Sequence, residues 1–141
     1  MAKELVVRNH LTDEMIAAGD RLTKYLDEAL AKIKASFWLL FPDKDWKLVL
    51  VSPLIKSLGP REIYKKIQNY ENQADQDEKI IPITNVWMMT EDNEIAHSLN
   101  YFVKAYDNVS NIRLSKSILN GNFIEDLYIY RINLNDNDND K

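Results

Sequence analysis

The stretch ILNGNFIEDLYIYRI, residues 118–132, decides the fold that the sequence predicts. Its Asn120-Gly121 dipeptide separates two runs rich in β-branched, aromatic and alternating polar residues. Asn-Gly is the strongest short signal for a hairpin, because both central residues of a type I′ turn need positive φ. We therefore expect residues 111–119 and 122–132 to form two antiparallel strands joined by a two-residue turn.

Two adjacent carboxylates, Glu125 and Asp126, lie in the second of these strands. A two-residue turn sets the register of the hairpin, so Lys116 should face Glu125 and Ser115 should face Asp126. Successive side chains of a strand point to opposite faces, so the two acids are not expected to act as a pair unless a bulge reorients one of them. We interpret Glu125 as the cross-strand ion-pair partner of Lys116.

The face that carries Asp126 is the candidate ligand-binding site. The predicted register places five polar or aromatic side chains on it: Arg113, Ser115, Asp126, Tyr128 and Tyr130. Such a set suits a polar ligand or a partner segment, and the alternative is a covered face on which hydroxyls or Arg113 satisfy Asp126. The opposite face is predicted to be a hydrophobic ladder of Ile112, Leu114, Ile118, Phe123, Leu127 and Ile129.

Three helices are predicted in the rest of the chain. Residues 12–33 repeat apolar side chains at steps of three and four, with Thr12 as the N-cap. Gly19 lies in the middle of this helix and allows a close approach to a sheet. A second helix should begin near Pro60, and Thr90 should cap a third.

A second hairpin is predicted from residues 35–41 and 46–52, which are apolar on both faces. Pairing Phe41 with Trp46 places Phe37, Leu39, Leu48 and Leu50 on one face and Trp38, Leu40, Val49 and Val51 on the other. Strands that are apolar on both faces belong in the middle of a covered sheet or in a dimer.

These elements predict one α+β domain over residues 1–132, followed by a disordered acidic, Asn-rich tail over residues 133–141. With a further strand at 83–89, the order is α-β-β-α-β-α-β-β. We expect a five-stranded, mainly antiparallel sheet with three helices and, numbering strands along the chain, the order 2-1-5-4-3. Over residues 12–132 this element order resembles the profilin-like and GAF-like folds in topology.

The composition excludes several classes of function. The chain of 141 residues has no cysteine, so a disulfide scaffold and a thiol nucleophile are excluded. No apolar run approaches the roughly 20 residues that span a bilayer, and no secretory signal is evident, which predicts a cytoplasmic protein. The net charge of −4 argues against binding to nucleic acid.

The segment SPLIKSLGPRE, residues 52–62, is a candidate anion site, with Lys56, Ser57 and Arg61 near a predicted helix start. Helix N-termini attract anions through free N–H groups and the helix dipole. The segment lacks the glycine spacing of a phosphate-binding loop, so an ordinary loop and helix cap is the alternative.

Catalytic patterns in the sequence are weak. Asp45-Trp46-Lys47 matches half of a metal-dependent nuclease site, but such triplets occur here as often as chance predicts. His10 and His97 have no metal-ligand spacing. The sequence therefore predicts no cofactor and no metal site.

We therefore expect a small, non-enzymatic binding or regulatory module of the cytosol. Its partner would be a protein, including a second copy of the chain as a homodimer, or a small ligand held on a sheet face or exposed apolar residues. One alternative is a metal-dependent hydrolase or nuclease that uses Asp45 and Lys47. Another is a nucleic-acid-associated protein that uses basic residues near the second helix: Lys56, Arg61, Lys65 and Lys66.

Overall fold

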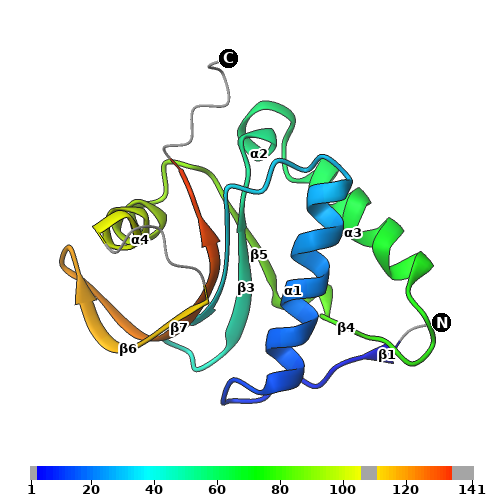
Figure 1. Cartoon of the computed structure of the whole chain (residues 1–141), viewed down its shortest axis with the longest axis horizontal. Coiled ribbons are helices and arrows are strands. Elements are labelled where there is room, and N and C mark those ends of the chain that lie inside the picture. Colours follow the sequence, from blue (N-terminus) through cyan, green and yellow to red (C-terminus); the bar gives the residue numbers. More distant parts are fainter. Residues whose placement is uncertain (1–2, 106–110, 135–141) are drawn as a thin grey trace.

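The computed structural model describes residues 3–105 and 111–134 (Figure 1). The elements follow the order β1 (Lys3–Glu4), α1 (Asp13–Glu28), β2 (Ala35–Leu40), β3 (Trp46–Val51), α2 (Pro53–Leu58), α3 (Arg61–Gln73), β4 (Lys79–Ile80), the 3₁₀ helix η1 (Ile83–Asn85), β5 (Val86–Met89), α4 (Glu94–Ala105), β6 (Ile112–Leu119) and β7 (Asn122–Ile132). Figure 1 shows α4 on one side of the main sheet and α1 and α3 on the other.

The main sheet has five strands in the order β5-β3-β2-β7-β6, and only the β3–β5 pair is parallel. The predicted α+β class and mainly antiparallel sheet are therefore confirmed. The predicted place of the strand at 83–89 beside 111–119 is wrong, because β5 pairs with β3. The helices α2 and α3 connect these two strands, as a helical crossover does between parallel strands.

The described residues form four α-helices rather than the predicted three. The additional helix, α2, begins directly after β3, where Ser52 is the N-cap and its Oγ accepts a hydrogen bond from Leu54 N at 3.1 Å. Pro53 occupies the first helical position, where its missing N–H is not needed. Local capping thus starts a helix in what the sequence suggested was a loop.

The register predicted for the β2–β3 hairpin is wrong by one residue, because Leu40, not Phe41, pairs with Trp46. Lys44 has a φ of 68°. Its N–H donates to Phe41 O at 2.8 Å, and this closes a longer turn than the sequence predicted. A shift of one residue exchanges the faces of one strand, so Trp38 shares a face with Leu48, and Phe37 shares the other with Val49.

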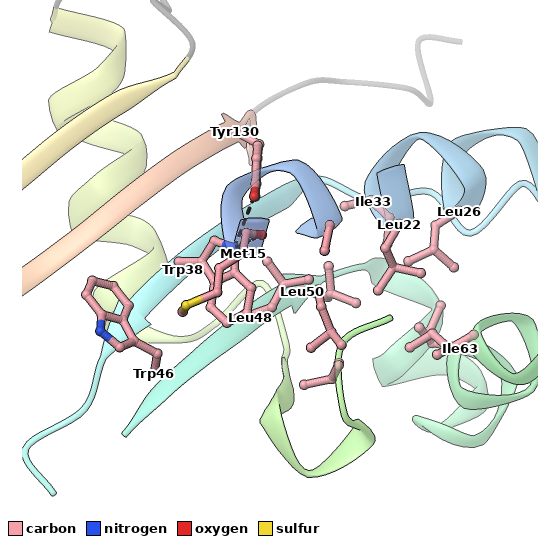
Figure 2. Packing of buried hydrophobic residues seen from close by; sticks show 14 of the residues in the cluster. Met15, Leu22, Leu26, Ile33, Trp38, Trp46, Leu48, Leu50, Ile63 and Tyr130 are labelled. Atoms are coloured by element: carbon pink, nitrogen blue, oxygen red, sulfur yellow. Dashed lines mark hydrogen bonds between the residues drawn. The ribbon is translucent and has the colours of Figure 1, made fainter. Parts of the chain in front are cut away.

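The helix α1 covers one face of the sheet (Figure 2). Thr12 caps it as predicted, through a 3.1 Å hydrogen bond from Met15 N to its Oγ1. The helix ends at Glu28, earlier than predicted, because Leu30 and Lys32 adopt positive φ values of 61° and 55°. The core on this face combines α1 and α3 with inward side chains of the sheet, including Met15, Leu22, Trp38, Leu48, Leu50, Ile63 and Tyr130.

The helix α4 covers the opposite face of the sheet. Its N-cap is Asn93 rather than the predicted Thr90, since Asn93 Oδ1 accepts hydrogen bonds from Ile95 N and Ala96 N at 2.9 and 3.1 Å. The buried residues on this face include Phe37, Val49, Val51, Leu99, Val103, Leu127 and Ile129. Both faces of the central strands are therefore covered, as their apolar sequence predicted.

The predicted tail begins with two residues that are packed on the domain. Asn133 N donates to Lys34 O at 2.8 Å. Leu134 is buried, and its N–H donates to Asn100 Oδ1 at 3.0 Å. The rest of the predicted tail, residues 135–141, lies outside the described residues. Within residues 3–105 and 111–134, none of the helices has the length and apolar character needed to cross a membrane.

Candidate functional site

Three of the five predicted ligand-binding residues form a closed polar cluster on β6 and β7. Arg113 Nε and Nη2 donate to the two carboxylate oxygens of Asp126 at 2.9 and 2.6 Å. Ser115 Oγ donates to Asp126 Oδ1 at 3.1 Å. The hydrogen bonds that Arg113 donates to Asp126 raise the pKa of Arg113 above its ordinary value. Asp126 is thus paired within the hairpin, as the alternative expected, but this part of the face is not covered, because Arg113 and Ser115 are exposed.

The fourth and fifth residues, Tyr128 and Tyr130, have hydrogen-bond partners outside this cluster. Tyr128 donates its hydroxyl hydrogen to Asn111 Oδ1 at 3.2 Å. Tyr130 is buried beneath α1, where its hydroxyl donates to Ile16 O and accepts from Trp38 Nε1 at 3.0 Å (Figure 2). Burial raises the pKa of Tyr130. The five predicted residues therefore do not line one open site.

The predicted Lys116–Glu125 ion pair is wrong. Lys116 has a φ of 47°, and the regular pairing of β6 with β7 is interrupted between Ser115–Asp126 and Ser117–Ile124. Glu125 lies instead 3.8 Å from Lys44 Nζ. The adjacent acids Glu125 and Asp126 thus contact different partners, and the register on either side of the interruption is the predicted one.

The same interruption changes which side chains at the hairpin end are exposed. Ile124 is buried in the core beneath α4, together with Leu127. Ile118 and Phe123, which the sequence placed on the hydrophobic ladder, are 71% and 60% exposed. Beyond the interruption, two large apolar side chains that the sequence placed on the buried ladder are therefore exposed.

Two of the three candidate anion-binding residues, Lys56 and Ser57, have partners within the protein. Lys56 Nζ lies 3.2 Å from Asp92 Oδ2, and Ser57 Oγ donates to Pro53 O at 3.2 Å within α2. Arg61 is exposed at the start of α3. On the same helix, Lys65 lies 3.7 Å from a carboxylate oxygen of Glu62, while Lys66 donates to a backbone carbonyl of the α1 C-terminus at 2.7 Å. Lys56, Lys65 and Lys66 thus make local contacts, and Arg61 is exposed.

The Asp45 and Lys47 pair is also held by its neighbours. Lys47 Nζ donates to Asp45 Oδ2 at 2.9 Å, and Asn85 Nδ2 donates to Asp45 Oδ1 at 3.3 Å. The ammonium lies 5.9 and 5.8 Å from the ring centroids of Phe41 and Trp87. In the part of the chain that the structure describes, no three His, Asp or Glu side chains are arranged to hold a metal ion.

A groove lies between α4 and the turn of the β6–β7 hairpin, and we call it the α4–hairpin groove. It has a volume of about 610 Å³ and is lined by His97, Ser98, Tyr101, Phe102, Ile118, Leu119 and Asn120. Tyr101 is 80% exposed and Ile118 is 71% exposed. Ser98 Oγ is buried and has no hydrogen-bond partner.

Local structure explains how these residues meet. The four residues from α4 lie at positions 97, 98, 101 and 102, and residues spaced by four share a helix face. The turn residues Asn120 and Gly121 adopt positive φ values of 51° and 85°, as the Asn-Gly signal predicted. Sequence analysis missed the groove because it placed Ile118 on the buried ladder. The signal that the sequence offered was the aromatic pair Tyr101 and Phe102, which follows His97 and Ser98 by one helical turn.

A second hollow, of about 490 Å³, lies between the C-terminal end of α1 and β7. Arg131 crosses it and donates to the two carboxylate oxygens of Asp27 at 2.7 and 2.6 Å, and to Ile33 O at 3.0 Å. The hydrogen bonds that Arg131 donates to Asp27 raise the pKa of Arg131 above its ordinary value. These hydrogen bonds link α1 to β7, and the guanidinium of Arg131 is paired within the protein.

No protein-family model, curated protein or solved structure matches this chain. The resemblance of its element order to profilin-like and GAF-like folds therefore stays a prediction.

Proposed function

We propose that this protein is a non-catalytic binding module of the cytoplasm whose ligand-contacting surface is the α4–hairpin groove. The observation that carries the proposal is the exposure of Tyr101 and Ile118 at a hollow of about 610 Å³. Concave sites of this size with aromatic and aliphatic walls are the usual form of small-ligand sites. Large exposed apolar side chains gathered at one place are typical of interaction surfaces.

The polar groups elsewhere support a binding role by their internal pairing. Asp126 is held by Arg113 and Ser115, and Lys47 is held by Asp45, so neither acid is left open for acid–base chemistry in this geometry. The proposed binding surface therefore differs from the polar sheet face that the sequence predicted, where Tyr130 is buried beneath α1.

A fluorescence titration with Nile red, an uncharged dye that brightens in apolar surroundings, tests the proposal. We expect the dye to bind the wild-type protein and Ile118→Asn to raise its Kd about tenfold, because burial of one such side chain is worth about 1.5 to 3 kcal/mol. Leu58→Asn is the matched control, since Leu58 is also exposed but does not line the groove.

The two variants also define the contrary result. If Nile red does not bind, or if Ile118→Asn and Leu58→Asn weaken it equally, the groove is not the binding surface. Circular dichroism of both variants shows that any loss is not a loss of folding.

A further inference from the structure

The hydroxyl of Ser98 distinguishes the α4–hairpin groove from a merely apolar depression. Its Oγ is buried, lines the groove and has no hydrogen-bond partner. Serine and threonine within helices commonly donate to the carbonyl four residues earlier. Thr23 in α1 does so to Gly19 O at 2.8 Å, and Ser57 in α2 does so to Pro53 O at 3.2 Å. Ser98 makes no such bond.

A buried polar atom without a partner is costly, and native proteins pair nearly all of them. A hydroxyl that lines a groove can be paired by whatever fills that groove. Ser98 Oγ is therefore a buried, unpaired polar contact in this site, whereas the other polar lining residues, His97 and Asn120, are exposed. Specificity in small-ligand sites arises from such isolated polar groups.

The other walls of the groove limit the chemistry of the ligand. Tyr101, Phe102, Ile118 and Leu119 provide aromatic and aliphatic surface, and no Asp, Glu, Lys or Arg is among the described lining residues. Aromatic ligands gain from offset or edge contacts with such rings. The net charge of −4 also disfavours an anion.

From these observations we infer that the groove binds a small, uncharged aromatic molecule that carries one hydroxyl group, and that this hydroxyl pairs with Ser98 Oγ. The inference rests on the proposed function and adds the ligand class to it. We favour a small molecule over a protein surface because the unpaired oxygen of Ser98 is buried among the lining residues, where a small ligand can reach it more readily than a flat partner surface.

Two probes that differ by one hydroxyl, 1-naphthol and naphthalene, test the inference by NMR titration of the ¹⁵N-labelled full chain. The wild-type protein should bind 1-naphthol about threefold to tenfold more tightly than naphthalene, the gain expected from one neutral hydrogen bond. Ser98→Ala should remove this preference without changing the affinity for naphthalene. Ser57→Ala, which removes a serine hydroxyl in another helix, should keep it.

The outcomes separate the two proposals. If both probes bind with equal affinity, or if Ser98→Ala keeps the preference for 1-naphthol, the assigned ligand class is overturned while the binding groove stands. If neither probe binds, or Ile118→Asn leaves both affinities unchanged, the proposed function fails as well. Ser98→Ala should also melt at the same temperature or higher, because it removes an unpaired hydroxyl and alanine favours helices. A clear loss of thermal stability would contradict the unpaired state of Ser98.

Discussion

At the residue scale, the absence of a side chain at Gly19 lets α1 lie against the sheet. A Cβ there would lie 2.8 Å from ring carbons of Tyr130 and closer still to its hydroxyl. Gly19→Ala should displace Tyr130 and disturb its hydrogen bonds to Ile16 and Trp38. We expect the free energy of unfolding, measured with urea, to fall by about 1 to 3 kcal/mol, as overpacking usually costs.

The neighbouring Ala17 provides the control, because it is exposed on the same helix. Ala17→Gly should lower the free energy of unfolding by about 1 kcal/mol through helix propensity alone. Alanine should therefore give a more stable protein than glycine at position 17 and a less stable one at position 19. A stabilising effect of Gly19→Ala would show that Tyr130 does not fill this space.

Ionisation of Tyr70 should lower the stability of the protein at high pH. Burial, followed by its hydrogen bond to Glu78, raises the pKa of Tyr70 from 10.0 to about 12. The unfolded chain therefore releases this proton first, and the stabilisation present below pH 10 is lost as the pH rises from 10.0 to about 12. Over this pH range, the free energy of unfolding measured with urea should fall less for Tyr70→Phe than for the wild-type protein. Parallel curves for the two would contradict the raised pKa.

At the element scale, the start of α4 depends on one side chain. Asn93→Ala removes the acceptor of two backbone hydrogen bonds, from Ile95 N and Ala96 N. We expect the free energy of unfolding to fall by about 1 kcal/mol, the usual value of an N-cap. Thr90→Ala, at the position that the sequence suggested, should change it by less than about 0.5 kcal/mol. Equal effects in thermal or urea unfolding would contradict this assignment.

The β6 strand contains a second local determinant, the positive φ of Lys116. Glycine adopts this conformation without cost, whereas a β-branched residue does not. Lys116→Gly should therefore leave the free energy of unfolding within about 0.5 kcal/mol, and Lys116→Val should lower it by about 1 to 2 kcal/mol. Urea unfolding of both variants tests this difference. If valine is tolerated as well as glycine, β6 is regular at this position.

At the scale of the whole molecule, an exposed residue of the groove and a buried residue of the core should differ in their effect on stability. Ile118 is exposed and belongs to neither core cluster, whereas Leu127 is fully buried beneath α4. Ile118→Asn should change the free energy of unfolding by less than about 0.5 kcal/mol. Leu127→Ala should lower it by about 2 to 5 kcal/mol. If chemical denaturation shows that Ile118→Asn is as destabilised as Leu127→Ala, Ile118 has a structural role and this prediction is wrong.

Local chemistry accounts for the parts of the fold that sequence analysis predicted. The Asn120-Gly121 turn and the Thr12 cap depend on contacts within a few residues, so they could be read directly. The coverage of both sheet faces followed from the apolar character of the central strands. The candidate site did not follow, because the outward direction of Ile118 depends on the backbone of Lys116, which no short motif predicted.

The sequence by itself determined the α+β class, the terminal hairpin and its register, because turn geometry and side-chain alternation act over short distances. Only the tertiary structure decided the pairing of β5 with β3, the burial of Tyr130 beneath α1 and the opening of the α4–hairpin groove. These features depend on how elements far apart in the chain pack together. Packing is set by the fit of whole surfaces, which local patterns do not contain.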